Sequence, residues 1–443
     1  MSSLVWRLVR RSRWILPLLS TVLFAFNSSV FAQDLTLEQA MREALARNQD
    51  LHAARSTVDA ARGRLEQAGL WPNPRLVLSN DTDRPFDNAG EYSRSIGISQ
   101  DFPIAGRIGR AKDVGRVDVA RALAEVNEVE RRLLGEVAAS FYSIVTFDQQ
   151  IRLRDRLIGI DESLVSTSQV RQRAGEVSEL DVNTAKLDLE RLRQERTVLT
   201  GERAEALATL VALLGLPPNA TPILNSTPPP IAPLPSLTHL TEQALNERPD
   251  LRLLALSADQ AQAEQALASA SAWEDWSVSL GVQQNKRVIV GAPPQPADKA
   301  LMLSLSIPLP LFNRNQGAST AAVADEEKAR EQLTALRLQI ENSVAGKYTL
   351  VTRLLTALNA YTQNTLPLSR SNAELARNAY RQGQVSIVEV IQAERQENEL
   401  NTAYTDAMGQ YLQAFAAMNT AADTWAPLMT HPIYSSTDQS GEH

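Results

Sequence analysis

The amino-acid sequence predicts a mostly helical protein with a small β part. Three observations lead to this fold class. The proline-free segment 106–173 carries apolar residues at helical spacing, two pairs of short segments alternate apolar and polar residues, and this order of elements occurs twice. We therefore expect two internal structural repeats, each with a helix, two strands, a long helix, a turn and a returning helix.

The first 32 residues predict a signal peptide rather than a part of the fold. Four arginines precede an apolar run at 14–26, and Val30-Phe31-Ala32 resembles a cleavage site. The run is too short to span a bilayer comfortably, so we expect cleavage after Ala32 and export from the cytoplasm. The chain has no cysteine, which excludes a lipid-anchor cysteine and disulfides.

Charge and hydropathy exclude further classes of protein. Removal of the four N-terminal arginines from 44 basic residues leaves 40 against 51 acidic residues, a net charge of −11. No basic surface typical of nucleic-acid binding remains. After Ala32 no apolar run is long enough for a transmembrane helix, so entry into a membrane would require a closed β-barrel.

Internal sequence matches define the two repeats, because they follow one order at offsets of 200 to 208 residues. A proline-rich linker at 214–236 separates them. We expect the first repeat at 33–213, the second at 237–422 and a C-terminal tail at 423–443. The matches pair Ala44-Leu45 and Asp50-Leu51 with Ala244-Leu245 and Asp250-Leu251, Asp101 to Ile104 with Pro308 to Leu311, and Gly175, Val177 and Ser178 with Gly383, Val385 and Ser386.

Each repeat begins with a helix and two strands. In the first repeat we expect one helix from Leu37 to about Gln67 with Thr36 as its N-cap, then strands at 75–80 and 92–101. In the second repeat the alternation is clearer. It covers Val278, Leu280 and Val282, and then Leu301, Leu303, Leu305 and Ile307.

This alternation is typical of membrane β-strands, and an ordinary antiparallel sheet with one face on a core is the alternative. Four strands in one subunit cannot close a barrel, since known single-chain barrels have at least about eight. We therefore expect several subunits to contribute strands to one barrel.

The segment 106–173 would be roughly 100 Å long as a single helix. Its apolar residues between Val119 and Ile144 form a narrow stripe, and charged residues cover the other faces. This pattern is typical of long antiparallel coiled coils, and a helical bundle without a passage is the alternative. In the second repeat Pro367 should kink or divide the corresponding helix.

The stretches RAGEVSELDV (173–182) and RQGQVSIVEV (381–390) predict two hairpin tips. A glycine follows one long helix in each stretch, and a serine with an acid three residues later resembles a capping box that starts the next helix. A purely structural role, in which these residues turn the chain and cap the helices, is sufficient to explain them. The glycines are Gly175 and Gly383, and the capping pairs are Ser178 with Asp181 and Ser386 with Glu389.

A functional interpretation of the same residues depends on geometry. If both tips lie together, far from the strands, several subunits would bring Asp181 and Glu389 around one narrow opening. A ring of carboxylates is a common device for selecting cations.

With these features the chain resembles the TolC family of outer-membrane channel proteins. The resemblance covers about residues 35–422 and rests on the two repeats, the paired strands before each helical hairpin, and both tip sequences. It implies a homotrimer with a twelve-stranded β-barrel in the lipid of the outer membrane and a helical α-barrel that extends into the periplasm. It also implies a periplasmic membrane-fusion adaptor protein at the tips and, through this adaptor, an inner-membrane RND pump.

The resemblance assigns roles to tip residues by position. It implies Gly175 and Gly383 as adaptor contacts and Glu389 as the acid of a constriction. Val385 occupies the position at which the best-known member has a basic residue of its closing network. Gln392 occupies the position of a second acid in that member's constriction. The residues expected at the tips and at the adaptor contact are Gly175, Ser178, Asp181, Tyr380, Gly383 and Ser386.

The segment PLPLFNRNQG (308–317) resembles the branch of the family that serves pumps for cobalt, zinc, cadmium and copper, although a strand end and a turn also explain its residues. We therefore expect heavy-metal cations as the transported substrates. A duct for type I protein secretion or for drug efflux is an alternative, and a periplasmic coiled-coil protein without a pore is another.

The sequence predicts no catalytic, cofactor or metal site. Its four histidines lack metal-ligand spacing, and the acidic pairs on the helices fit solvated faces. We therefore expect a passive channel and not an enzyme. The histidines are His52, His239, His431 and His443.

Overall fold

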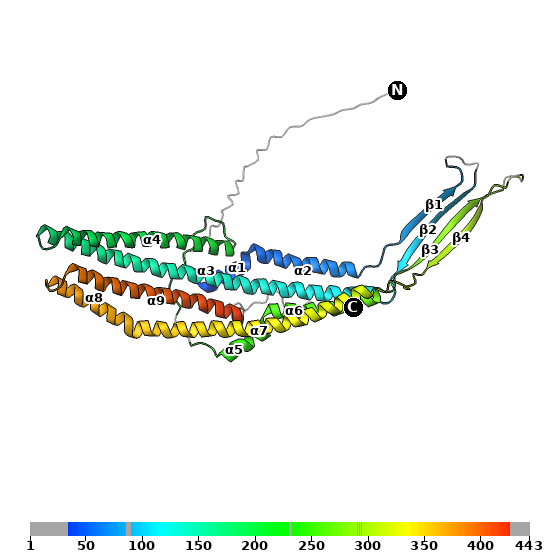
Figure 1. Cartoon of the computed structure of the whole chain (residues 1–443). Coiled ribbons are helices and arrows are strands. Elements are labelled where there is room, and N and C mark those ends of the chain that lie inside the picture. Colours follow the sequence, from blue (N-terminus) through cyan, green and yellow to red (C-terminus); the bar gives the residue numbers. More distant parts are fainter. Residues whose placement is uncertain are drawn as a thin grey trace, which may run out of the picture.

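The computed structural model describes residues 34–85, 90–229, 233–289, 291, 293 and 295–425. They form an elongated subunit, with a small sheet at one end and long helices that run from it to two hairpin tips at the other end (Figure 1). The predicted signal peptide and most of the predicted tail lie outside the described residues. The prediction of a mostly helical fold with a small antiparallel sheet is confirmed.

The first predicted helix consists of two helices, so the expectation of a single helix was wrong. α1 (Leu37–Arg47) and α2 (Gln49–Ala68) meet at Asn48, whose backbone is extended with a ψ of 126°. The Asn48 side chain accepts a hydrogen bond from the Leu51 N–H and donates one to the Leu213 carbonyl, both at 3.0 Å. The second bond joins residues 165 positions apart, so tertiary contact supports the break.

Two later helices are divided in the same way. α5 (Leu237–Glu247) and α6 (Pro249–Ala270) meet at Arg248, which also has a ψ of 126°. Here Pro249 enforces the break, because proline disfavours the helical conformation of the residue before it.

The predicted N-cap of α1, Thr36, is confirmed by its capping box.

The alternating segments form strands, as predicted, and the four strands form one antiparallel sheet in the order β1-β2-β3-β4. β2 and β3 come from distant parts of the chain and pair from Tyr92 opposite Lys286 to Phe102 opposite Trp276. This pairing joins the two halves of the chain and leaves β1 and β4 at the edges. The strands are β1 (Arg75–Thr82), β2 (Tyr92–Phe102), β3 (Trp276–Lys286) and β4 (Asp298–Ser306).

The two faces of the sheet differ in chemistry. The register places Leu78 opposite Ile96, Ile96 opposite Val282, and Val282 opposite Leu301, so apolar side chains cross all four strands on one face. These four side chains are exposed in the subunit. The opposite face carries mainly small and polar residues, with Val77 and Met302 as the larger apolar members. The small and polar residues include Ser79, Ser95, Gly97, Ser99, Ser279, Gly281 and Ser304.

The long helices agree with the prediction. α3 (Arg107–Arg173) is unbroken over 67 residues, which corresponds to roughly 100 Å. The predicted join at Pro367 is also confirmed, since the π-helical turn η1 (Tyr361–Thr365) precedes it and the rod bends there (Figure 1). The remaining helices are α4 (Glu179–Leu213), α7 (Gln316–Ala360), α8 (Leu366–Arg381) and α9 (Ile387–Ala422).

These helices pack side by side as a layer. α3 lies between α4 and α9, and α9 also packs against α7 and α8, whereas α4 has little contact with α9. Closer to the sheet, α2 and α6 both pack against α3, and α6 packs against α7 (Figure 1). One edge of the layer is therefore made by α4 and α2, and the other by α7 and α8.

The main core lies along α9, which packs against α3 on one side and α7 on the other. Val137 and Ile144 of the predicted α3 stripe are fully buried there. Glycine permits a close approach of α3 and α9, because a Cβ atom on Gly135 would lie 2.5 Å from the Thr420 side chain. A larger residue at this position would therefore force α3 and α9 apart.

Candidate functional site

Both hairpin tips end their first helix in the same way. The Gly175 N–H donates to the carbonyl of Gln172, and the Glu176 N–H donates to that of Arg171, each at 2.9 Å. This is a Schellman motif, which requires a left-handed residue, and Gly175 has a φ of +77°. Gly383 takes the same role in the second tip with a φ of +72°.

Serine caps start both returning helices. Ser178 and Asp181 form a complete capping box, as predicted. At the second tip the Ser386 Oγ accepts from the Glu389 N–H at 3.4 Å, and the Ser386 hydroxyl donates to the Glu389 carboxylate at 3.2 Å. The predicted second box is thus replaced by a cap in which the carboxylate meets the hydroxyl instead of the backbone N–H.

The tips lie together at the end of the subunit away from the sheet (Figure 1). Tyr380 differs from the other predicted tip residues, because its side chain is only 5% exposed and packs with Ala185 and Ile387. A side chain this deeply buried offers a partner little surface. The exposed members of the predicted set are Gly175, Ser178, Gly383, Ser386, Glu389 and Gln392, and Asp181 is partly buried.

Arg171 joins the two hairpins just above their tips. Its guanidinium carbon lies 4.1 Å from the centre of the Tyr380 ring, and its Nη2 donates to the Tyr380 carbonyl at 3.2 Å. The same guanidinium is 3.5 Å from the carboxylate of Glu176. The Tyr380 hydroxyl has no hydrogen-bond partner among the described residues.

Three buried carboxylates meet deeper between the hairpins, one each from α3, α4 and α9. Asp188 of α4 accepts two hydrogen bonds of 2.9 Å from the guanidinium of Arg395 on α9. Glu394 of α9 accepts from Arg377 at 3.3 Å. Asp161 of α3 is 7% exposed and has no ion-pair partner among the described residues.

This environment changes the protonation of the cluster. Burial, followed by the negative charges of Glu394 and Asp188, raises the pKa of Asp161 to about 7, although Arg191 and Arg395 oppose the shift. Burial also raises the pKa of Glu394. Near neutral pH, part of the Asp161 population therefore carries a proton.

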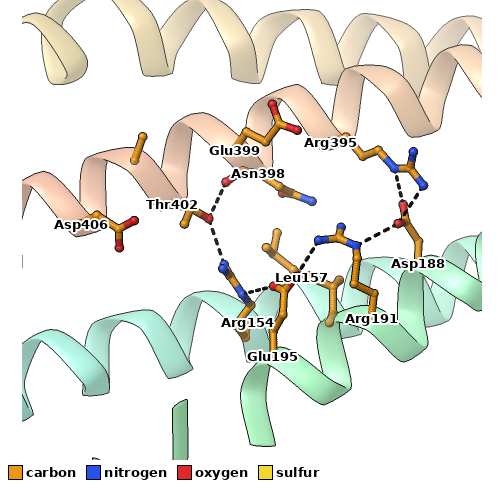
Figure 2. Close-up of a pocket in the computed structure, with 12 residues that line it drawn as sticks. Arg154, Leu157, Asp188, Arg191, Glu195, Arg395, Asn398, Glu399, Thr402 and Asp406 are labelled. Atoms are coloured by element: carbon orange, nitrogen blue, oxygen red, sulfur yellow. Dashed lines mark hydrogen bonds and ion pairs between the residues drawn. The ribbon is translucent and has the colours of Figure 1, made fainter. Parts of the chain in front are cut away.

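A groove of about 590 Å³ follows the same boundary between the hairpins (Figure 2). Arg154 of α3 spans it, donating to the Thr402 hydroxyl of α9 at 2.9 Å and contacting Glu195 of α4 at 2.8 Å. The Asp188 pair with Arg395 crosses at a second level (Figure 2). Together with the Gln150 amide, which donates to the Asp406 carboxylate at 2.7 Å, these links hold the hairpins together along the groove.

Sequence reasoning missed Arg171 and the carboxylate cluster. A signal for the cluster existed, since Asp161 follows the buried Leu157 by four residues and Glu394 follows the buried Val390 by four. An acid in the register of buried positions indicates an unusual environment. For Arg171 no comparable local signal exists.

Other kinds of site are not found in the described part of the chain. It contains no group of three His, Cys, Asp or Glu side chains that could hold a metal ion. None of its helices combines the length and apolar content needed to cross a membrane. His52 lies 3.1 Å from the Ala46 carbonyl and His239 is in the first turn of α5, whereas His431 and His443 lie outside the described residues.

A family model matches most of the chain. The model of the outer membrane efflux protein family covers residues 40–216 and 240–423. The two matched segments correspond to the parts of the chain on either side of the proline-rich linker.

Individual proteins and solved structures also resemble the chain, at sequence identities between 21% and 25%. The cobalt-zinc-cadmium resistance protein CzcC of Cupriavidus metallidurans is 24% identical over 86% of this chain and 88% of its own length. The toluene efflux pump outer membrane protein TtgF of Pseudomonas putida is 25% identical over 51% of this chain and 49% of its own. The crystal structure of CusC superposes with a TM-score of 0.69 at 21% identity, over 88% of this chain and 92% of that one.

Proposed function

Because the chain belongs to the outer membrane efflux protein family, we propose that it is the outer-membrane channel of a tripartite efflux system. It conducts substrates passively from a periplasmic adaptor and an inner-membrane RND pump to the exterior. The chain is an outer-membrane transport component and not an enzyme.

One observation carries this proposal: the subunit has a membrane-compatible sheet at one end and both helical tips at the other (Figure 1). The apolar face of the sheet is exposed, as expected of a surface that faces lipid. The serine-rich face would line water. A pore-less coiled-coil protein would have no use for such a sheet.

We propose that the subunit works as a homotrimer. A four-stranded sheet with open edges at β1 and β4 cannot close by itself, and three copies would supply twelve strands. The long helices of three copies would form the α-barrel in the periplasm. In this arrangement the outer face of the β-barrel contacts outer-membrane lipid.

The domain organisation belongs to the same proposal. Residues 1–32 are the signal peptide, 33–213 and 237–422 are two structural repeats, 214–236 is the linker, and 423–443 is the tail. The paired helix breaks at Asn48 and Arg248 support the repeats, because they lie 200 residues apart and have the same backbone ψ.

The exposed tips are the proposed contact for the adaptor, through Gly175 and Gly383 and the caps that follow them. Glu389 and Gln392 line the proposed constriction. Tyr380 contributes by joining the hairpins, because its buried ring contacts Arg171 of the other hairpin. The proposed contact residues for the adaptor are Gly175, Ser178, Asp181, Gly383 and Ser386, and Tyr380 supports them from behind the tip surface.

Heavy-metal cations are the proposed substrates, supported by the similarity to CzcC along most of the chain. Export of organic compounds is the second candidate, supported by the shorter match to TtgF. Deletion of the gene followed by challenge with zinc, cobalt, cadmium, copper, dyes and solvents separates the two. Loss of metal tolerance, restored by the intact gene, supports the first candidate, whereas new sensitivity to organic compounds alone contradicts it.

The trimer is tested independently of the substrate. Outer-membrane fractions are run on a denaturing gel with and without boiling, and a heat-sensitive trimer is expected. A monomer recovered from the soluble periplasmic fraction would contradict both the trimer and the channel.

A further inference from the structure

The charged side chains of the four strands divide between the two faces of the sheet. Successive residues of a strand point to opposite faces, and with this alternation the register places Arg94, Lys286 and Lys299 on the apolar face. Among the described strand residues, that face carries no acid. The acids of the strands all lie on the serine-rich face, and they are Asp81, Asp101 and Asp298.

The three cations occupy one end of the apolar face. Arg94 and Lys299 belong to one row across the sheet, since Gln284 lies directly opposite Arg94 on one side and Lys299 on the other. Lys286 is in the next row, opposite Tyr92. Both rows lie beyond the apolar rows, at the strand ends farthest from the helices (Figure 1). In the proposed channel this end of the sheet points to the exterior.

Aromatic side chains mark the opposite end of the same face. Phe102 and Trp276 lie directly opposite each other there and are 40% and 37% exposed. Arg94 precedes Phe102 by eight residues of β2, which is about 27 Å of strand at about 3.4 Å per residue. With the roughly 40° tilt of strands in membrane barrels, this length becomes about 21 Å across the membrane, close to their roughly 25 Å apolar band. The cations therefore lie at the level of lipid head groups and outside the hydrocarbon, where a charge is costly.

Tyr92 holds two of these cations close together. The guanidinium carbon of Arg94 lies 4.4 Å from the centre of the Tyr92 ring, and the Nζ of Lys286 lies 5.9 Å from it. The Arg94 Nε donates to the Asn80 Oδ1 at 2.9 Å, which fixes the side chain along the apolar face. Lys299 is exposed and makes no hydrogen bond or ion pair with another described residue. Three neighbouring strands thus present positive charge on one surface, an arrangement that attracts anions.

We propose that Arg94, Lys286 and Lys299 bind the phosphate groups of lipid head groups in the outer leaflet of the outer membrane, as lipopolysaccharide carries them. The inference rests on the proposed channel and deepens its lipid contact from an apolar surface to a site for phosphate. Charge selects the phosphate, because guanidinium and ammonium groups are the side chains that bind it. Continuity with the apolar rows selects a phosphate that is attached to acyl chains.

The test uses the full chain, purified as a trimer from outer-membrane fractions. The probe is bisphosphorylated lipid A in detergent micelles, and dephosphorylated lipid A and inorganic phosphate are compared with it. Lys299→Gln should weaken lipid A binding about fivefold, the effect expected of one cation near an anionic lipid surface. Arg94→Gln combined with Lys299→Gln should weaken it about 25-fold.

Asp298→Asn is the matched control, because Asp298 precedes Lys299 in β4 and lies on the opposite face. It changes the net charge by one unit, as Lys299→Gln does, but with the opposite sign. Lipid A binding should stay the same in Asp298→Asn. A gain as large as the loss in Lys299→Gln would show that net charge alone decides binding, and it would overturn the proposed site.

A comparison of the lipids with the unmodified protein does not depend on the folding of any variant. Equal binding of lipid A with and without its phosphates would overturn the inference. Displacement of lipid A by inorganic phosphate at the same concentration would also overturn it, because such a site would recognise free anions. Either result leaves the trimer and the channel intact, whereas recovery of the unmodified chain only as a soluble periplasmic monomer contradicts the proposed function itself.

Discussion

The Arg171 guanidinium stacks on the ring of Tyr380 and so joins the first hairpin to the second, 209 positions later in the chain. The contact lies just above the exposed tips, beside a buried apolar cluster in which Ala185 of the first hairpin packs with Tyr380 and Ile387 of the second. Its strength should therefore influence how readily the tips separate.

Replacing Arg171 with Ala should loosen the tips. A cation–π contact contributes about 0.5–2 kcal/mol, and about 1 kcal/mol corresponds to a roughly fivefold larger open population. Hydrogen exchange of the amides at 380–390 should therefore become faster. Arg173→Ala is the matched control, because among the residues that the structure describes Arg173 bonds only to the Gln169 carbonyl of its own helix. Equal exchange in both variants would contradict the role of Arg171.

The free energy of unfolding of the subunit should fall as pH rises from about 4 to about 7. The pKa of Asp161 is raised to about 7, so in this window the folded subunit binds a proton that the unfolded chain has released. Asp161→Asn mimics the protonated form and should raise the apparent Tm at pH 8 while flattening the pH profile. Some slope should remain, because burial also raises the pKa of Asp423 to about 6.

The control for this experiment is Glu162→Gln, at an exposed neighbour on the same helix. Its surface ion pair with Arg193 contributes at most about 1 kcal/mol, so its pH profile should follow that of the unmodified protein. A profile of Asp161→Asn that also follows the unmodified protein would show that Asp161 is already ionised in the folded state.

Gly175→Ala should destabilise the first tip although an added Cβ would meet no atom within 4 Å. The cost comes from the φ of +77°, and left-handed backbone costs a residue with a side chain about 1–2 kcal/mol. Gly159→Ala is the matched control, because that site is equally open but helical. It should stabilise the subunit by about 0.5–1 kcal/mol. Thermal unfolding that gives both changes the same sign would refute this account.

Gly281→Ala should impair the sheet. A Cβ at this position would lie 2.7 Å from the Ile96 carbonyl oxygen and 2.9 Å from the Gly97 Cα, so the β2–β3 pair would have to shift. The yield of heat-sensitive trimers in the outer membrane should fall. Ser95→Ala, on the same face, should leave the yield nearly unchanged, and similar yields for both variants would exclude a steric requirement for glycine.

Glu389→Gln should reduce the preference for cations in single-channel recordings. The change removes one negative charge per subunit from the proposed constriction and keeps the size of the side chain. Ser386→Ala is the informative companion, since it removes the hydroxyl that contacts Glu389 but no charge. Unchanged selectivity in Glu389→Gln would leave this residue with a capping role only.

The sequence alone predicted the features that depend on near neighbours. The length of α3, the alternation of the strands, the join at Pro367 and the glycines of both tips are confirmed. Each of these follows from residues within a few positions of one another, through helical periodicity, strand periodicity or capping. Backbone preferences of glycine and proline act at the same short range.

Only the tertiary structure showed the break at Asn48, the contact of Arg171 with Tyr380, and the burial of Asp161 without an ion-pair partner among the described residues. Asn48 bonds to a carbonyl 165 residues away, and the Asp161 environment is made by α4 and α9. The energies of such groups depend on burial and on charges brought near by packing, which no local pattern contains. Local chemistry thus determined the elements and the tips, whereas packing between distant helices determined how the hairpins are held together.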